Sequence, residues 1–334
     1  MTWKVAVKDQ VKLQMEITNY CNAACSACAR EWVNKPYKDE ERNKSPYRWK
    51  LNDSYVDLET FKSWLDKDDW TKLEKIFFCG NYDEPATNPD LIPICKWIIN
   101  SKDLFPSLPS IAISSNGGTR NEKFWSDLGK LSKDSKRIRV NFAIDGFSDT
   151  NHLYRVNVDW KILQRNYRAY LKAGGLAWWQ FIIFKHNEHE VNLVEEYAKN
   201  EGFEKVKFIG SVRPSTEVVS HVKDKKANPN PTYTKVVPAC YKTKKQEHGL
   251  FISHNGVISP CCWIATKAGL SDVWLKNKGD YTESILNGSN SIQEIFDSQW
   301  FSQFRKNMES GNFSKCSEKC KMNNNNTQRF EELQ

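Results

Sequence analysis

The sequence predicts an α/β fold: a partial (β/α)6 TIM-like barrel with a small, cysteine-rich domain at its C-terminal end. From Val11 to about Ser211, short runs rich in β-branched and aromatic residues alternate with segments of helical period, which is typical of βα units around a parallel sheet. Six such units are too few to close an eight-stranded barrel. The chain has ten cysteines, and half of them lie between Cys240 and Cys320, beyond the last unit.

The predicted strands are short, and three of the segments between them carry apolar residues that recur every three or four positions. After the third strand these residues are Phe124, Leu128 and Leu131. The predicted strands cover residues 11–18, 75–80, 110–115, 138–145, 178–185 and 205–210. Because parallel strands of a barrel end at one mouth, side chains at these ends are expected to meet.

Composition divides the chain into four parts. Residues 1–215 form the predicted barrel, and the polar, proline-containing run 216–238 is predicted to be a linker. Residues 239–322 form the cysteine-bearing domain, and residues 323–334 are expected to be a disordered tail. Within the third part a helix is predicted over 292–308, because Ser291 and Glu294 have the spacing of a capping box.

Charge and hydropathy limit the classes of function. The first residues contain no apolar signal segment, and no apolar run is long enough to cross a bilayer, so we expect a cytoplasmic protein without a membrane partner. Cytosolic cysteines are kept reduced, which favours metal binding over a disulfide framework. The net charge of +8 and the 13 tryptophans would suit nucleic-acid binding. Because the lysines are scattered, we favour a solvated surface and do not expect a nucleic-acid partner.

Three cysteines follow the first predicted strand with the spacing Cys-x3-Cys-x2-Cys. They are Cys21, Cys25 and Cys28, and the position of their loop places three thiolates at the barrel mouth. Three thiolates can hold a [4Fe–4S] cluster and leave its fourth iron open to another ligand. A zinc site is the alternative interpretation of this spacing.

This cysteine pattern, placed after strand one of an incomplete barrel, resembles the radical S-adenosylmethionine (SAM) superfamily. The resemblance implies that Cys21, Cys25 and Cys28 are the catalytic metal ligands and that the open iron binds the methionine part of SAM. It further implies reductive cleavage of SAM to a 5′-deoxyadenosyl radical. The family usually has an aromatic residue before the third cysteine, where this chain has Ala27.

A second motif ends the second strand, where the run from Gly80 to Pro85 resembles the family's Gly-Gly-Glu-Pro. The resemblance implies that Gly80 and Glu84 belong to the SAM site, with Glu84 receiving the methionine amino group. Asp83 stands where the family usually has glycine, so the local geometry is expected to differ. The alternative for Glu84 is an acid favoured by a helix N-terminus.

Three further motifs lie at later strand ends. Ser115 and Asn116 resemble the Thr-Asn-Gly turn of many members, which implies a place near the ribose, although a turn alone would explain the following glycines. Arg155, downstream of an Asp-Gly pair, resembles the arginine that holds the methionine carboxylate; a surface salt bridge is its alternative. The serine expected at Ala143 is missing, and Asn141 on the same strand face is the substitute that we expect.

Asn187, after the fifth strand, matches an asparagine that relatives carry close to the cofactor. The resemblance therefore implies a SAM-binding role for Asn187 as well.

The C-terminal cysteines resemble the SPASM and Twitch extensions of the same superfamily. Cys240 is followed by Gly-x4-Cys ending at Cys261, and then by Cys316 and Cys320. Four cysteines fit the shorter Twitch form, which implies one auxiliary [4Fe–4S] cluster. Structural zinc is the alternative, and Cys262 could replace Cys261 as a ligand.

Together these resemblances imply a radical SAM enzyme with an oxidoreductase-like reaction. They imply hydrogen-atom abstraction from a small-molecule or peptide substrate, followed by oxidation in which the auxiliary cluster accepts an electron. The clusters would receive electrons from a donor such as flavodoxin or ferredoxin. Two alternatives stay open: redox-neutral epimerisation or decarboxylation of a sugar, nucleotide or peptide, with Cys79 as a hydrogen donor, and modification of nucleic acid. The sequence does not identify the substrate.

Overall fold

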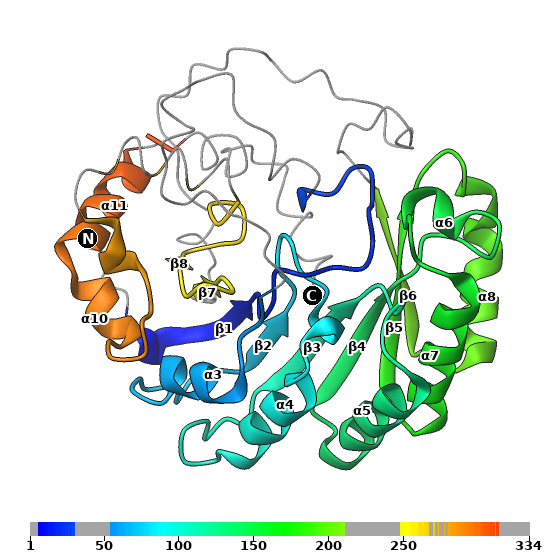
Figure 1. Cartoon of the computed structure of the whole chain (residues 1–334), viewed down its shortest axis with the longest axis horizontal. Helices are drawn as coiled ribbons and strands as arrows, with labels where there is room; N and C mark the ends of the chain where they lie inside the picture. Colours follow the sequence, from blue (N-terminus) through cyan, green and yellow to red (C-terminus); the bar gives the residue numbers. More distant parts are fainter. Residues whose placement is uncertain are drawn as a thin grey trace.

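The computed structural model describes residues 6–30, 54–210, 248–266, 280–310 and 312–313, together with residues 270, 273 and 277. These residues build an eight-stranded sheet in the order β6-β5-β4-β3-β2-β1-β7-β8, which is mostly parallel and open (Figure 1). Only the last pair is antiparallel. The strands are β1 (Gln10–Met15), β2 (Lys75–Phe78), β3 (Ser110–Ser115), β4 (Ile138–Ala143), β5 (Leu176–Ile183), β6 (Lys205–Gly210), β7 (His248–Ile252) and β8 (Ile258–Ser259).

Helices cover the outer side of the curved sheet (Figure 1). The α-helices are α3 (Leu58–Leu65), α4 (Leu91–Asn100), α5 (Glu122–Ser135), α6 (Asn151–Tyr154), α7 (Trp160–Lys172), α8 (Val191–Glu201), α10 (Ile292–Asp297) and α11 (Gln299–Glu309). The 3-10 helices are η1 (Val7–Asp9), η2 (Pro85–Thr87), η3 (Glu188–Glu190) and η5 (Tyr281–Ser284). In the part of the chain that is described, no helix combines the length and apolar character that a membrane span requires.

The predicted α/β partial barrel is confirmed, with strand bounds that differ by up to three residues at some ends. Its core lies between the sheet and the helices. Alternate strand residues such as Leu13, Ile76 and Val140 are fully buried, whereas intervening residues such as Gln14 and Asn141 are only partly buried. This alternation follows from the period of two along a strand.

The predicted helix over 292–308 is two helices. Ser291 and Glu294 form the expected capping box at the start of α10. The chain then bends at Ser298, whose extended backbone ends α10 and whose side chain accepts a hydrogen bond from the backbone N–H of Phe301 to begin α11. The bend occurs because Ser298 supplies a second N-terminal cap within the apolar pattern.

The hairpin of β7 and β8 was not expected from the sequence. β7 lies parallel to β1 with Leu13 opposite Leu250 and Met15 opposite Ile252. Residues from the predicted C-terminal domain therefore extend the barrel sheet beyond its first strand. The domain boundaries themselves stay predictions, and the linker 216–238 and the tail 323–334 lie outside the described residues.

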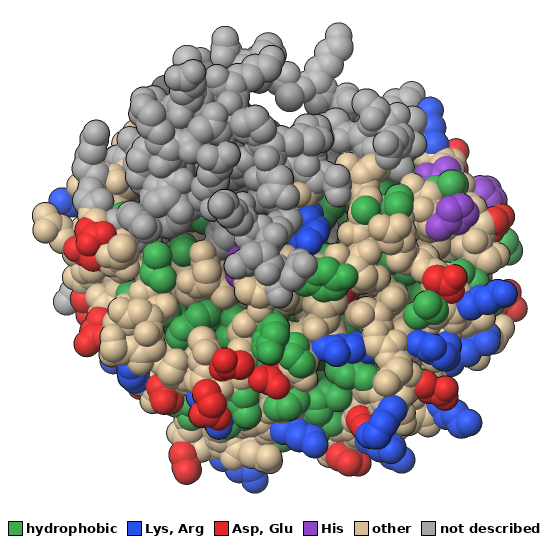
Figure 2. Space-filling view, viewed as in Figure 1, with side chains coloured by type: hydrophobic (Ala, Val, Ile, Leu, Met, Phe, Trp, Pro, Cys, Tyr) green, Lys and Arg blue, Asp and Glu red, His purple; other side chains and the backbone are tan. Residues whose placement is uncertain are grey.

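Charged side chains of both signs are interspersed over the described part of the face in Figure 2. Among the described residues, surface ion pairs include Arg139 with Glu204 and Arg168 with Glu201. Such mixing agrees with the interpretation of the positive charge as a solvated surface.

Candidate active site

The three cysteines lie on the irregular loop that follows β1, at the carboxyl edge of the sheet. All three thiols are free; Cys25 is buried, and Cys21 and Cys28 are half-buried. Two backbone N–H groups point at sulfurs, from Ala23 to Cys21 Sγ at 3.4 Å and from Arg30 to Cys28 Sγ at 3.5 Å. The loop therefore presents its sulfurs together and supplies donors that stabilise thiolates.

The electrostatics of this loop oppose three thiolates unless a cation is present. Burial raises the pKa of Cys21 to about 12, Glu84 adds to this effect, and Cys25 and Cys28 raise it further. Burial also raises the pKa of Cys25, although Arg155 acts in the opposite direction. A bound metal group would replace the thiol protons and offset this repulsion.

The donor set suits a cluster that leaves one iron open. Among the residues that the structure describes, no three His, Cys, Asp or Glu side chains converge on the position of one metal ion. A cubane makes a different demand, because each cysteine binds a different iron. Three free thiols on one loop, with Cys25 and Cys28 close enough to raise the pKa of Cys21, meet that demand.

Arg155 reaches the cysteine loop from the other side of the mouth. Its Nε donates to Asp145 Oδ2 at 2.6 Å, and its Nη1 lies 3.9 Å from Cys25 Sγ. The Asp145 side chain is fully buried and that of Arg155 is 14% exposed, so the surface salt bridge considered for Arg155 is wrong. Burial alone would lower the pKa of the guanidinium, but Asp145 and Cys25 raise it well above its usual range.

Glu84 and Asn116 join the second and third strand ends to the same loop. Glu84 Oε2 accepts a hydrogen bond from the Asn116 backbone N–H at 2.6 Å, and Oε1 accepts one from Ala86 at 3.2 Å. Glu84 therefore does cap η2, while it also lies near enough to Cys21 to raise the pKa of that thiol. Asn116 Nδ2 lies 3.7 Å from Cys21 Sγ. Ser115 Oγ accepts from the Gly117 N–H at 3.0 Å and so stabilises the turn.

The two other predicted asparagines differ in how their amides are used. Asn141 Oδ1 is buried without a hydrogen-bond partner among the described residues, so it can accept a bond from a ligand. Asn187 is fully buried and donates to the carbonyls of Asp145 and Ile182, both at 2.9 Å. Its amide therefore fixes the loop after β5 against the end of β4. The SAM-binding roles of both residues stay predictions.

Gly80 is a glycine because a buried acid occupies the space beside it. A Cβ atom at Gly80 would overlap the carboxylate of Glu16, which directly follows β1. Glu16 Oε1 accepts from the N–H groups of Asn81 at 2.8 Å and Tyr82 at 2.7 Å. Asp83, which replaces the family's glycine, accepts from the Gly80 N–H at 2.6 Å, and burial together with Glu16 raises the pKa of Asp83.

The second cysteine set is described only at Cys261, which is half-buried just after β8. Cys240, Cys316 and Cys320 lie outside the described residues. The four-cysteine site therefore stays a prediction.

No protein-family model matches the sequence, and no curated protein matches it. Solved structures do match. anSMEcpe with bound AdoMet aligns at a TM-score of 0.55 and 14% identity, over 90% of this chain and 81% of that chain. The SAM complex of SuiB from Streptococcus suis aligns at 0.51 and 13% identity, over 79% and 65% of the two chains. Both are radical SAM enzymes. The chain has the radical SAM fold.

This result confirms the fold that the cysteine motif implied, and at such identities it concerns the fold alone. The SuiB complex with its precursor peptide SuiA gives a similar likeness, with a TM-score of 0.54 at 9% identity over 89% of this chain and 66% of that chain. The chain thus spans about two thirds of the length of SuiB. The SPASM or Twitch assignment is not decided by these alignments.

Within the radical SAM fold, the sequence motifs missed Glu16, Asn19 and His254. All three are buried beside the predicted site. One signal was available for Glu16: an acid directly after an apolar strand and before the cysteine loop. No local pattern marks His254.

Proposed function

We propose that this chain is a radical SAM enzyme that abstracts a hydrogen atom from a small-molecule or peptide substrate. The observation that carries the proposal is the meeting of the cysteine loop with Glu84, Asn116 and Arg155 at one mouth. When bound, a [4Fe–4S] cluster on Cys21, Cys25 and Cys28 supplies the electron that cleaves SAM to a 5′-deoxyadenosyl radical.

The protein side chains around this loop have complementary tasks. Asp145 orients the Arg155 guanidinium, whose remaining N–H groups suit the methionine carboxylate. Glu84 offers a buried carboxylate for the methionine ammonium. Asn116, Ser115 and Asn141 supply polar groups for the rest of the cofactor, and the helices behind the sheet keep these groups in place.

An oxidation assisted by an auxiliary cluster is the outcome that we propose. Cys261, on the segment that follows the hairpin packed on β1, would bind that [4Fe–4S] cluster with Cys240, Cys316 and Cys320. Loss of a hydrogen atom and then of one electron and one proton oxidises the substrate, and the cluster takes the electron. A flavodoxin or ferredoxin would supply the reducing electron. The complexes of SuiB with SuiA and of anSMEcpe with Cp18Cys peptide support a peptide as the substrate class.

Iron analysis and SAM cleavage test this proposal. Anaerobically reconstituted protein should contain about eight irons per chain, four for each cubane, and should form 5′-deoxyadenosine with reductant. Cys21→Ala should lose about half of the iron and all cleavage, and Cys261→Ala should lose the other half. Cys95→Ala is the matched control, since Cys95 is buried on α4. Zinc in place of iron would exclude the proposal.

A redox-neutral reaction is the second candidate, and the position of Cys79 favours it. Cys79 directly follows β2, beside Cys262 and Ser114, and burial raises the pKa of its thiol above the usual range. The thiol thus keeps its hydrogen near neutral pH. The substrate radical would take that hydrogen atom, and the resulting thiyl radical would be reset by one electron from the same class of donor and one proton. In D2O, solvent deuterium would enter the product carbon, and Cys79→Ser would abolish this.

A further inference from the structure

We propose that His254 is a positioning residue that ties the β7–β8 hairpin to both loops of the SAM site. The residue lies in the turn between the two strands, far along the chain from the cofactor motifs. Its side chain is 5% exposed and touches two buried residues at the mouth of the barrel, Glu16 and Asn19. This inference rests on the proposed function, because the loops that it concerns are those assigned to the cluster and to SAM.

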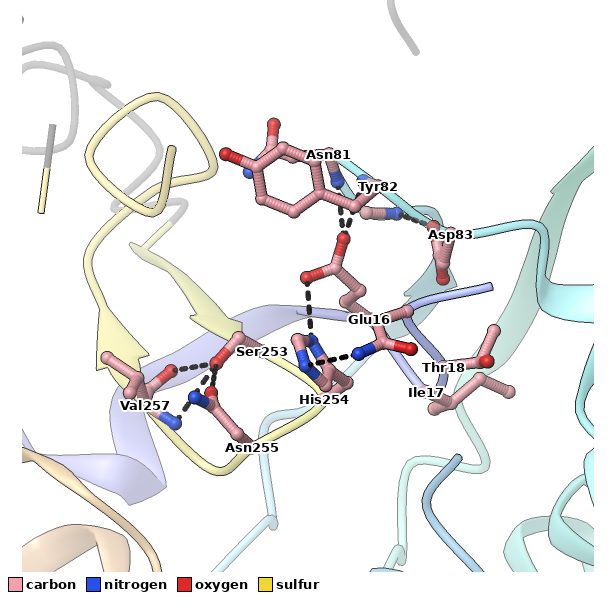
Figure 3. A network of polar contacts seen from close by, with 12 residues as sticks. Glu16, Ile17, Thr18, Asn81, Tyr82, Asp83, Ser253, His254, Asn255 and Val257 are labelled. Carbon is pink, nitrogen blue, oxygen red and sulfur yellow. Dashed lines mark hydrogen bonds and ion pairs between the residues drawn. The ribbon is translucent and has the colours of Figure 1, made fainter. Parts of the chain in front are cut away.

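The first contact acts through Glu16 on the loop that carries Glu84. His254 Nδ1 lies 3.5 Å from Glu16 Oε2, while Oε1 of the same carboxylate accepts the N–H groups of Asn81 and Tyr82 (Figure 3). With Oε2 facing the imidazole, Oε1 stays directed at these two amides. The position of His254 thereby sets the orientation of the carboxylate that fixes the backbone of the second motif.

The second contact acts through Asn19 on the cysteine loop. Asn19 Nδ2 lies 3.3 Å from His254 Nε2, and Asn19 precedes Cys21 by two residues. If the amide donates to Nε2, the neutral ring carries its proton on Nδ1, the nitrogen that lies in polar contact with Glu16 Oε2 at 3.5 Å without a hydrogen bond. Arg30 completes the connection, because its Nη1 donates to the carbonyls of Asn19 and Tyr82 at 2.5 and 2.9 Å.

The hairpin that presents His254 is itself well fixed. The Glu16 backbone N–H donates to the Ile252 carbonyl at 2.9 Å, which continues the β1–β7 pairing up to the turn. Within the turn, Ser253 Oγ donates to Asn255 Oδ1 at 2.7 Å and accepts from the Val257 N–H at 3.1 Å. The side-chain bonds of Ser253 stay inside the turn, so Ser253 supports the hairpin without reaching the SAM loops.

A further hydrogen bond connects the same loop to the cysteines beyond the hairpin. Asn81 Nδ2 donates to the Cys262 carbonyl at 2.9 Å. The segment that carries Cys261 and the loop that carries Glu84 are therefore held together at two points, one at His254 and one at Asn81. A shift of the hairpin would move both loops of the SAM site.

Full-length variants of His254 test this role with readouts besides turnover. His254→Leu removes both contacts, His254→Gln keeps a donor and an acceptor on a side chain that can reach both partners, and Ser253→Ala weakens only the turn. Iron content, the affinity for SAM and the change in the EPR spectrum of the reduced protein on adding SAM are measured for each. Thermal unfolding of every variant monitors folding.

We expect His254→Leu to retain its iron and to bind SAM about tenfold more weakly, with a reduced spectral change, as supporting residues around metal sites do. His254→Gln should recover most of the affinity, and Ser253→Ala should bind like the wild type even if it unfolds at a lower temperature. Equal affinities in His254→Leu and the wild type would overturn the inference, as would equal losses in His254→Leu and Ser253→Ala. A wild-type protein that binds neither iron nor SAM would instead refute the proposed function.

Discussion

Two buried acid–base pairs flank the cysteine loop, and they are built differently. On the β4 side, Asp145 and Arg155 are 2.6 Å apart, and the arginine reaches Cys25. On the β1 side, Glu16 and His254 are 3.5 Å apart, and the histidine reaches the loop through Asn19. Asp145 and Arg155 lie ten residues apart in the sequence, within one βα unit. His254, in contrast, lies 235 positions from Asn19, the residue that it contacts on the cysteine loop. One pair stabilises a local unit, and the other joins two segments that are far apart in the sequence.

The largest effect is expected at the β4 pair. Asp145→Asn leaves the Arg155 guanidinium buried without its counter-charge, which costs about 3–5 kcal/mol of unfolding free energy. Urea unfolding of full-length protein measures this loss. Adding Arg155→Met to Asp145→Asn should restore part of the stability, because the uncompensated charge is then gone. If Asp145→Asn lost less unfolding free energy than Glu16→Gln, the β4 pair would not be the more stabilising of the two pairs.

A smaller effect is expected at the β1 pair. Glu16→Gln preserves shape and an acceptor for Asn81 and Tyr82 but removes the charge, and hydrogen bonds to charged groups contribute about 1.5–3 kcal/mol. We therefore expect a loss of about 2 kcal/mol in the same urea experiment. The variant should also open the β7–β8 hairpin to hydrogen exchange more than Asp145→Asn does. Equal exchange of the hairpin in both variants would contradict a role for Glu16 in joining β1 to the hairpin.

A third long-range contact joins the segment after α3 to the start of α10. Asp68, after α3, accepts the N–H groups of Ile292 at 2.8 Å and Gln293 at 3.0 Å and so caps α10. Asp68→Ala should cost about 1–2 kcal/mol. Burial raises the pKa of Asp68 in the folded protein above the ordinary value of 3.8. The contribution of this pKa shift to the free energy of unfolding is therefore complete below pH 3.8 and declines as the pH rises through the pKa of the folded state. Comparison of wild type and Asp68→Asn across this range measures the decline.

The smallest effect is expected at a local cap. Asp57 accepts the Thr60 N–H at 2.7 Å at the start of α3, and Asp57→Ala should cost about 1 kcal/mol. Hydrogen bonds from Thr60 lower the pKa of Asp57 in the folded protein below the ordinary value of 3.8. The contribution of this pKa shift to the free energy of unfolding is therefore complete above pH 3.8 and is lost as the pH falls through the pKa of the folded state. The pH trends of Asp57→Asn and Asp68→Asn should therefore have opposite signs. If the stability differences of both variants from the wild type changed in the same direction with pH, burial would not be the cause that distinguishes the two caps.

The same contrast explains what could be predicted from the sequence. The barrel strands and the position of Arg155 near the cysteine loop lie within local patterns, where strand period and motif spacing restrict the geometry. β7, Glu16 and His254 form contacts across more than two hundred residues, and no local period encodes such contacts. Gly80 is the local sign of this long-range packing. Any side chain at position 80 would overlap the carboxylate of Glu16, so the position requires glycine.

The place of β1 in the sheet has a consequence for how the protein is made. β1 lies between β2 and β7, so it keeps one open hydrogen-bonding edge until residue 252 has been synthesised. Such distant pairing is slow and comes late in folding. The loop with Cys21, Cys25 and Cys28 extends from this same strand, so the framework behind it is completed only once β7 has been synthesised. We therefore expect stable cluster insertion at these cysteines to follow the synthesis of β7 and its pairing with β1.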